Sequence, residues 1–379
     1  MPITAADLFR YADDQIQKAA QKQWPHAEIR LGQHTPSVTG YVRSLSCDGK
    51  ILYAKYSFLG LSLVSVLRGT CGSFDVVRAA QAAYVSSPGS LLEREAEQLR
   101  LMTVAALRAP QVAGHAGGVL FTRPLEGPTL GELIVKEPHR TEELCGRALR
   151  VLGDGLAAIT ARAQRFEIGE RGIPATFTRK FNGVSGRTYL GLSGDHAPVL
   201  AAVVDRLRKL GLATATGPRA LVYGDLKPEH VIYPDGPDCA PGFLDPGMAN
   251  GRVQADVAKL ISRTFLNLIA EPLPAVNPTP VADGLGALVE HRIWHLTNDE
   301  RPVWLRELVL LWLMDTTNIL STYLTCPLTL PLPELAGALT QRAEAVCGLL
   351  DTVSALLAED RSAPVWPSAL AEAVQAATA

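Results

Sequence analysis

The sequence lacks the patterns that mark secreted, membrane-spanning or nucleic-acid-binding proteins. Its six cysteines are scattered with no CxxC or CxxH spacing, which argues against a structural zinc site and a disulfide framework. The formal net charge is −2 at pH 7, so there is no basic field of the kind that attracts nucleic acid. The longest apolar runs, such as LVLLWLM at 308–314, are too short to span a bilayer.

Signal-peptide features, long blocks of like charge and internal repeats are also missing. Charged residues already occur within the first turns of MPITAADLFRYADDQ, unlike a secretory leader. Basic clusters such as Arg206, Arg208 and Lys209 are typical of the solvated face of a helix. We therefore expect a cytoplasmic globular protein that binds neither nucleic acid nor membrane, and the sequence carries no indication of its oligomeric state.

The first third of the chain, residues 1–125, has the pattern of a small sheet with helices. An amphipathic helix is expected over 4–24, and AEIRLGQ, GYVRSLSC and KILYAKYS indicate three strands. A helix over 90–102 begins with a capping-box pattern, and GGVLFTRPLEG supplies another strand. These patterns predict a small antiparallel sheet carrying one prominent helix, with a helical insertion at about 57–89.

The remaining residues, 126–379, are mostly helical in pattern, with a short strand pair near their middle. Apolar residues recur at a period of three to four through six segments, and the tail after a Pro-marked break is expected to form a peripheral helix. The whole chain is thus predicted to be α+β and bilobal, with a sheet-rich lobe before a larger helical lobe. The six segments are 141–166, 196–211, 254–270, 282–297, 303–324 and 333–358.

A short stretch just past the middle of the chain concentrates the residues that could carry chemistry. VYGDLKPEHVIY at 222–233 is followed by GFLDPGM at 242–248, so Asp225 and Asp245 each follow an apolar, strand-like run. Alone, the Gly-Asp pair would indicate only a turn after a strand. Its combination with Pro228 and with the second acidic motif favours a catalytic or metal-binding unit instead.

The chain resembles the aminoglycoside phosphotransferase family of small-molecule kinases, which has a protein-kinase-like bilobal fold. The resemblance rests on YGDLKPEHVIY, GFLDPGMA, YAK and REAEQLRLM, which occur in the family's order, and it extends over roughly residues 28–270. It implies that 1–125 binds nucleotide and that 126–379 carries the catalytic and substrate-binding residues. The activity so implied is magnesium-assisted transfer of a phosphoryl group from ATP or GTP to a hydroxyl of a small molecule.

The resemblance assigns roles to three residues of the acidic stretch. Asp225 matches the catalytic aspartate of HGDxxPxN, which orients the acceptor hydroxyl and takes its proton. Asp245 stands where the DFG aspartate ligates magnesium, and Pro246 in place of the Phe indicates a stiff turn. His230 stands where the family most often has a metal-binding Asn. Magnesium prefers oxygen ligands, so an imidazole is a poorer ligand for it than the Asn side chain. The imidazole of His230 could ligate metal by nitrogen, act through a water or hydrogen-bond Asp225.

A lysine and a glutamate are expected to act on the nucleotide phosphates. Lys55 in LYAKYS matches the strand lysine that contacts the α- and β-phosphates in the family. REAEQLRLM aligns Glu95 best with its helix partner, with Glu93 and Glu97 as close alternatives. Because helical residues two apart face different directions, only one of the three can lie opposite Lys55.

The resemblance also places a nucleotide hinge and a phosphate loop. VLFTRPLEG aligns with the strand that offers backbone groups to adenine, around Thr122–Leu125. Pro124 has no N–H, so any hinge donor must be Arg123 or Leu125. RLGQHTPSVTGYV lacks the GxGxxG pattern and matches a phosphate-binding loop only weakly.

The sequence does not identify the acceptor substrate. An aminoglycoside, whose phosphorylation would confer antibiotic resistance, is a polycation and needs a carboxylate-lined site. Five acids could furnish that site or could simply lie on solvated helix surfaces: Asp299, Glu300, Asp315, Glu359 and Asp360. Other antibiotics, sugars, nucleosides and amino alcohols are alternative acceptors. A kinase-fold protein that binds nucleotide with weak or no catalysis is the second hypothesis, favoured by Tyr223, His230 and Pro246.

Overall fold

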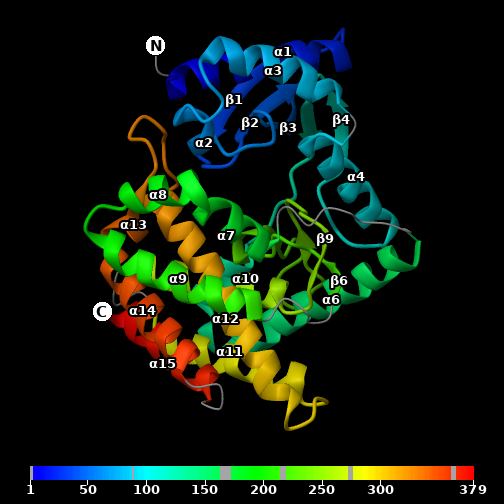
Figure 1. Ribbon diagram of the computed structural model, residues 1–379. Helices are drawn as coiled ribbons and strands as arrows, with labels where there is room; N and C mark the ends of the chain where they lie inside the picture. The colour runs from blue at the N-terminus through cyan, green and yellow to red at the C-terminus, as the bar shows by residue number, and fades with distance from the viewer. Residues whose placement is uncertain (1–2, 88, 163–171, 214–218, 272–275, 360–363) are drawn as a thin grey trace. The chain divides into compact units, whose positions relative to one another are not determined.

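The chain divides into two compact units. One comprises Met1–Leu125 with Cys326–Glu334, and the other comprises Glu126–Thr325 with Leu335–Ala379. The first is built on an antiparallel sheet and the second is mostly helical, which confirms the predicted α+β class (Figure 1). The computed structural model describes residues 3–87, 89–162, 172–213, 219–271, 276–359 and 364–379.

A five-stranded antiparallel sheet, ordered β1-β2-β3-β5-β4, is the framework of the N-terminal unit. Strands β2 and β3 join at Asp48–Gly49, where both residues have positive φ, 49° and 78°, as a two-residue hairpin turn requires. This register places Lys55 in the middle of the sheet, opposite Val42 of β2 and Leu120 of β5. The strands are β1 Ile29–Thr35, β2 Tyr41–Cys47, β3 Lys50–Tyr56, β4 Val112–Ala116 and β5 Val119–Thr122.

Helix α1, Ala5–Gln23, packs on this sheet through the apolar face that the sequence predicted. Leu8 and Ile16 on that face are fully buried. The helix begins in a capping box: Asp7 N–H donates to Thr4 Oγ1 at 3.2 Å, and Thr4 N–H donates to the Asp7 carboxylate at 3.3 Å. The predicted opening helix is therefore confirmed within a residue at each end.

The start of α4, Leu91–Val104, differs from the predicted capping box. Ser90 is the N-cap residue but its side chain makes no cap hydrogen bond. The Glu93 carboxylate accepts instead from the N–H of Gly89, at 2.9 Å, one residue before the expected donor. The insertion before this helix contains two helices, as expected: α2 Leu63–Leu67 and α3 Phe74–Ser86.

All six predicted helical segments have a counterpart in the C-terminal unit, with one of them divided at Arg342 into α13 and α14. The prediction for 163–166 lies outside the described residues, and 294–297 follows the end of α11. The short helices α5, α7 and α8 were not predicted, because fewer than three turns carry little periodic signal. The helices are α5 Leu130–Lys136, α6 Thr141–Arg162, α7 Ile173–Phe181, α8 Gly183–Gly191, α9 Ala197–Ala213, α10 Ala255–Ala270, α11 Pro278–Ile293, α12 Glu300–Leu324, α13 Glu334–Gln341, α14 Ala343–Glu359 and α15 Val365–Thr378, with 3₁₀ turns η1 Pro138–Arg140, η2 Gly194–His196 and η3 Pro228–His230.

The last helix, α15, is a core element, so the prediction of a peripheral helix is wrong. It packs against α10, α11, α12 and α14. Trp366 is 3% exposed, and its ring lies 6.3 Å edge-on from Trp312, which in turn stacks on Phe265 at 5.4 Å. The alanines along the inner face of α15 are buried and let the backbone approach its neighbours closely. Among the described residues, no helix is both long and apolar enough to cross a membrane.

Two short antiparallel ladders interrupt the helices and frame the acidic stretch. Strand β6, Arg219–Val222, pairs with β9, Ala249–Arg252. Strand β7, Val231–Ile232, pairs with β8, Gly242–Phe243. Asp225 follows β6 and Asp245 follows β8, so the two ladders fix the loops on which the predicted catalytic residues lie.

Candidate active site

The loop after β6 is held by hydrogen bonds from its backbone to a carboxylate on α10. Asp256 accepts hydrogen bonds from the backbone N–H groups of Tyr223, at 2.7 Å, and Gly224, at 2.8 Å. Gly224 has a φ of +83°, and a Cβ there would lie 2.1 Å from the carbonyl oxygen of Gly247, so only glycine fits. The Tyr223 hydroxyl donates to the carbonyl of Leu244, which joins this loop to the one carrying Asp245.

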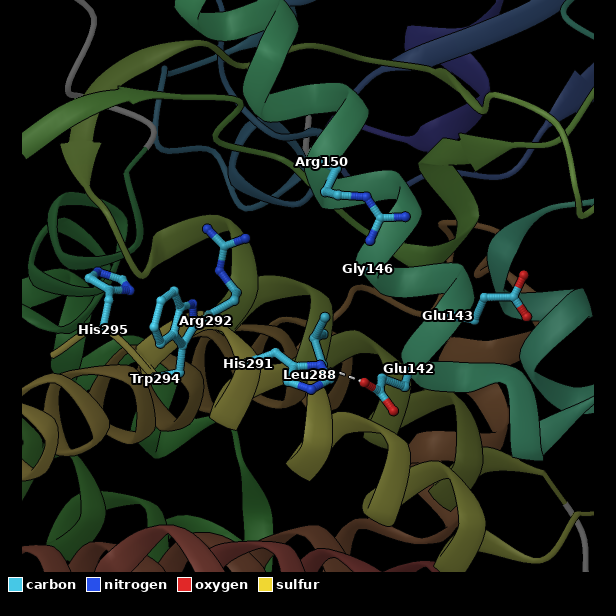
Figure 2. A pocket seen from close by; sticks show the side chains of 9 residues that line it. All are labelled: Glu142, Glu143, Gly146, Arg150, Leu288, His291, Arg292, Trp294 and His295. Atoms are coloured by element: carbon cyan, nitrogen blue, oxygen red, sulfur yellow. Dashed lines mark ion pairs between the residues drawn. The ribbon is translucent and has the colours of Figure 1, made fainter.

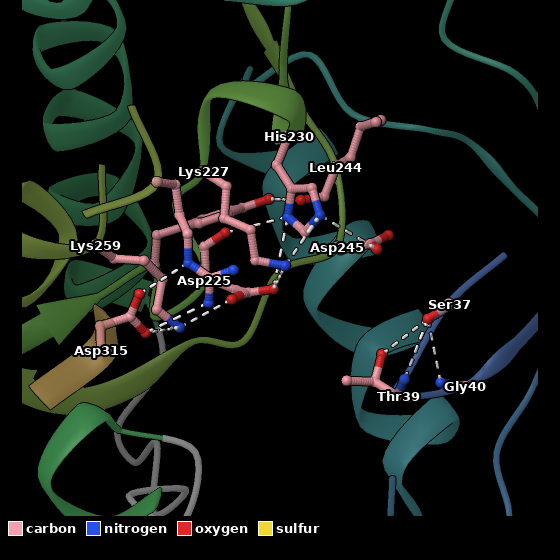
Figure 3. A network of polar contacts seen from close by, with 12 residues as sticks. Ser37, Thr39, Gly40, Asp225, Lys227, His230, Leu244, Asp245, Lys259 and Asp315 are labelled. Atoms are coloured by element: carbon pink, nitrogen blue, oxygen red, sulfur yellow. Dashed lines mark hydrogen bonds and ion pairs between the residues drawn. The ribbon is translucent and has the colours of Figure 1, made fainter. Parts of the chain in front are cut away.

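Asp225 lies between two lysine side chains. Lys259 Nζ is 2.9 Å from Asp225 Oδ1, and Lys227 Nζ is 3.0 Å from Asp225 Oδ2 (Figure 3). Burial alone would raise the pKa of Asp225, but the charges of Lys227 and Lys259 hold it well below the usual value of 3.8. The carboxylate is therefore ionised at any physiological pH and fixed in orientation.

His230 bridges the two acidic residues. Its Nδ1 lies 3.1 Å from the backbone carbonyl oxygen of Asp225, which can only accept, so Nδ1 carries the proton. Its Nε2 lies 3.4 Å from Lys227 Nζ and 3.7 Å from Asp245 Oδ2. Burial and then the charge of Lys227 lower the pKa of His230, so at neutral pH the imidazole is neutral with its lone pair on Nε2.

Asp245 has a left-handed backbone, with φ of +56°, a conformation that aspartate tolerates better than most residues. Its side chain is 44% exposed, the most accessible in the cluster. Two backbone hydrogen bonds hold the surrounding turn, from Leu244 N–H to His230 O at 2.8 Å and from Gly247 N–H to Tyr223 O at 3.0 Å. The structure thus brings Asp225, His230 and Asp245 together, as the sequence predicted.

A buried ion-pair chain behind Asp225 was not predicted from the sequence. Lys259 on α10 also lies 3.9 Å from Asp315 Oδ1 on α12, and Arg263 Nε lies 2.8 Å from Asp315 Oδ2. Asp315 is 3% exposed, so it is committed to this network rather than to a surface. The available signal was the spacing on α10, because Lys259 is one turn after Asp256 and shares its face.

The ammonium group of a lysine, and not an open metal site, lies among the side chains of the Asp225 cluster. Lys227 Nζ contacts both the Asp225 carboxylate and the ring of His230. In the part of the chain that the structure describes, no group of three or more His, Cys, Asp and Glu side chains is placed to hold a metal ion. Any divalent cation would have to displace this ammonium or bind on the Asp245 side of the cluster.

In the N-terminal unit, Lys55 of β3 and Glu95 of α4 form an ion pair. Lys55 Nζ lies 2.6 Å from Glu95 Oε1, and the two side chains are 17% and 9% exposed. Of the two alternatives to Glu95, Glu93 accepts from Gly89 N–H, and Glu97 is exposed. Glu95 is thus the residue of the three that faces the central strand.

The predicted hinge segment begins at Thr122, the last residue of β5. Thr122 is buried, and the N–H of Arg123 donates to the carbonyl of Gln111 at 2.9 Å. The N–H of Leu125 has no hydrogen-bond partner among the described residues. Of the two candidate hinge donors, only Leu125 therefore keeps its N–H for a ligand.

In the turn between β1 and β2, backbone N–H groups donate hydrogen bonds to a side chain of the same turn. Ser37 Oγ accepts from the N–H groups of Thr39, at 3.2 Å, and Gly40, at 3.5 Å (Figure 3). These are the amides that a phosphate-binding loop would direct at a ligand. The match of this turn to a phosphate loop stays weak.

Comparisons with known proteins point to one family. A family model described as the phosphotransferase enzyme family matches residues 76–277, slightly more than half of the chain. No curated protein matches the sequence at a significant level.

Several solved structures are similar, at low identity. An ethanolamine kinase from Plasmodium vivax is 13% identical, with a TM-score of 0.49, and the match covers 91% of this chain and 88% of that one. A choline kinase from Cryptosporidium parvum Iowa II is 10% identical, with a TM-score of 0.49 and coverage of 88% and 94%. An aminoglycoside-3'-phosphotransferase of type VIII is 18% identical, with a TM-score of 0.47 and coverage of 81% and 99%.

These structural likenesses are too distant to carry information on the substrate. The family match is independent of them and includes both acidic motifs and the helix that carries Glu95. The chain therefore belongs to the phosphotransferase enzyme family.

Proposed function

We propose that this protein transfers the γ-phosphoryl group of ATP or GTP to a hydroxyl of a small molecule, with Mg²⁺. The observation that supports it best is the Asp225 carboxylate, which is ionised and oriented by Lys227 and Lys259 on a loop tied to that of Asp245. Phosphoryl transfer needs an acceptor for the hydroxyl proton, cations for the phosphate charge and fixed positions for both substrates. The cluster supplies candidates for the first two.

Asp225 is assigned to hold the acceptor hydroxyl. With its pKa so low, it is a weak base towards an unreacted alcohol, and its main contribution is to orient the oxygen. Because the transition state is loose, the hydroxyl proton becomes acidic only as the new P–O bond forms. The carboxylate then accepts that proton late in the step.

Lys227 is assigned to the transferred phosphoryl group. Its Nζ lies in the same small volume as Asp225 Oδ2 and His230 Nε2, at 3.0 and 3.4 Å, so phosphate oxygens arriving there would meet an ammonium ion. Moving this lysine onto the phosphate would also free one oxygen of Asp225 for the acceptor hydroxyl. Lys259 would remain on the other oxygen and keep the carboxylate in place.

The residues present fit a magnesium ion on the Asp245 side of the cluster. The Asp245 carboxylate supplies the hard oxygen that Mg²⁺ prefers. His230 has its Nδ1–H fixed on a backbone carbonyl, so Nε2 carries the lone pair and lies 3.7 Å from Asp245 Oδ2. Lys227 Nζ lies 3.4 Å from the same nitrogen, so this lone pair would be free for the ion once the ammonium moves onto the phosphate. Bound there, the ion would neutralise phosphate charge and align the nucleotide for displacement.

In the N-terminal unit we assign nucleotide binding to the ion pair and the hinge. Glu95 holds the ammonium of Lys55 at the centre of the sheet, where it can bind the α- and β-phosphates. The N–H of Leu125, with Thr122 and Arg123 beside it, is the proposed contact to the purine base.

The charges around Asp225 favour an acceptor that is not a polycation. Lys227, Lys259 and Arg263 lie in this network, and Asp315 is already paired within it. Glu300, another acid considered for an aminoglycoside site, is occupied at the start of α12, where Thr297 N–H donates to it at 2.9 Å, and Asp360 lies outside the described residues. We therefore place neutral or anionic hydroxyl compounds, such as sugars and nucleosides, ahead of aminoglycosides and amino alcohols.

A screen of nucleoside triphosphate consumption tests this proposal. ATP and GTP would each be incubated with Mg²⁺ and a panel of sugars, nucleosides, amino alcohols and aminoglycosides, and phosphorylated product would be detected by mass spectrometry. We expect product from at least one neutral or anionic acceptor. Nucleotide binding without transfer to any acceptor would instead support the alternative, a kinase-fold protein that binds nucleotide with little or no catalysis.

A further inference from the structure

A pocket of about 700 Å³ lies in the C-terminal unit between α6 and α11, and none of its lining residues belongs to the Asp225 cluster (Figure 2). Glu142, Gly146 and Arg150 of α6 line one side, and Leu288 and Arg292 of α11 line the other. Small-molecule sites have volumes of about 300–1,000 Å³, so the pocket has room for more than a single ion.

The acidic residues at this pocket already have partners. Glu142 Oε1 lies 2.7 Å from His291 Nδ1. Glu143 Oε1 lies 2.9 Å from an Arg140 nitrogen and 2.7 Å from an Arg147 nitrogen. Both carboxylates are therefore engaged, and two arginines compensate the charge of Glu143, so the pocket is a poor site for a cation.

The two arginines of the pocket make no hydrogen bond or ion pair within the described residues. Burial lowers the pKa of Arg292 and the charge of Asp256 opposes that shift, whereas the side chain of Arg150 is exposed. Figure 2 shows their guanidinium groups on one side of the pocket, across from the pair formed by His291 and Glu142. Arginine stays charged at any physiological pH, and its planar set of donors matches the oxygens of a carboxylate or phosphate.

An apolar surface lies beside these cations. The indole of Trp294 is 72% exposed, unusually high for so large an apolar side chain. Leu288 contributes a methyl group to the pocket wall, and Gly146 opposite it has no side chain. A Cβ on Gly146 would lie 3.6 Å from Leu288 Cδ1, so a larger side chain there would take up pocket volume. Exposed indoles bind aromatic rings by stacking or edge contacts.

We propose that this pocket binds a small anion that carries an aromatic ring. Its carboxylate or phosphate would contact Arg150 and Arg292, and its ring would lie against Trp294. The site is distinct from the residues assigned to phosphoryl transfer, and the inference holds whether or not that assignment is correct.

The test uses phenyl phosphate as the probe and isothermal titration calorimetry of the full chain. Inorganic phosphate tests whether the ring contributes, benzoate tests whether a carboxylate serves as well, and benzylamine tests the sign of the charge. We expect phenyl phosphate or benzoate to bind at least tenfold more tightly than inorganic phosphate, and benzylamine not to bind.

Three variants locate the binding site. Arg150→Gln removes a cation that has no hydrogen bond in the described residues, and Gly146→Leu fills the pocket with a residue that favours helix. Each should weaken binding of the aromatic anion at least tenfold, as expected for a lost charge-assisted hydrogen bond or a blocked site. Lys227→Gln, which removes a cation of the Asp225 cluster, should leave the affinity unchanged.

The proposal is overturned if neither phenyl phosphate nor benzoate binds the wild type. It is equally overturned if Lys227→Gln abolishes binding while Arg150→Gln retains it, since the anion would then occupy the Asp225 cluster. Thermal unfolding of each variant checks its fold. If Gly146→Leu fails to fold, Arg150→Gln alone decides the outcome.

Discussion

Replacing Lys259 with methionine should raise the pKa of Asp225 and show which cation holds the carboxylate ionised. Lys259 Nζ lies 2.9 Å from Asp225 Oδ1, and the two side chains are 10% and 30% exposed, so solvent screens the pair only partly. An opposite charge at this range favours the ionised carboxylate and so lowers its pKa. Losing it should therefore raise the pKa of Asp225, but not fully to the usual value, because Lys227 remains.

The same change should alter how stability depends on pH. The depressed pKa of Asp225 means that its ion pairs stabilise the fold fully above the unfolded-state pKa of about 3.9. That contribution is lost as pH falls through the lower, folded-state pKa. Without Lys259, the free energy of unfolding near pH 7 should fall by about 1.5–3 kcal/mol, the range for a hydrogen bond between charged groups.

The assay is a pH titration of carboxyl-labelled aspartate by carbon NMR, in protein without nucleotide or metal, with Asp225→Asn identifying the signal. Lys259→Arg should keep the low pKa, because the charge is retained. Lys209→Met is the matched control, since Lys209 pairs with Asp205 at 2.7 Å on an exposed helix face. An unchanged titration of Asp225 in Lys259→Met would refute the reasoning.

Three further changes test other parts of the account. Asp245→Ala should abolish the dependence of nucleotide affinity on Mg²⁺, and fluorescence titrations with and without the ion would check this. His230→Asn should keep activity with Mg²⁺ and remove any loss of metal affinity at acidic pH; equal pH shifts in both proteins would argue against ligation by His230. Trp366→Ala should lower the free energy of unfolding in urea by about 3–5 kcal/mol, whereas Trp294→Ala should change it little.

The parts of the fold that the sequence predicted are those with a clean local period. Leu8 and Ile16 recur at helical spacing, and the strand KILYAKYS alternates between faces of the sheet. Strand β4 was missed because VAGHA has too few large apolar residues to alternate visibly. The burial of α15 was missed because its inner face is largely alanine, whose burial depends on close neighbours rather than on its own hydrophobicity.

The candidate site likewise contains residues that the sequence predicted and residues that it did not. Asp225, His230 and Asp245 were found because they lie within one short stretch with a recognisable spacing. Lys259 and Asp315 were not found, since they come from two separate helices and meet only through tertiary packing. A sequence pattern indicates which groups react, but the charges that set their pKa values come from elsewhere in the chain.

Transfer of the γ-phosphoryl group by wild type and by Asp225→Asn tests the central claim most directly. With an acceptor from the screen, product would be quantified under saturating nucleotide and Mg²⁺, alongside nucleotide affinity for both proteins. We predict that Asp225→Asn binds nucleotide like the wild type and loses about 10²–10⁴-fold in kcat, because an amide cannot accept the proton. Retention of most of the wild-type turnover by Asp225→Asn would contradict the account.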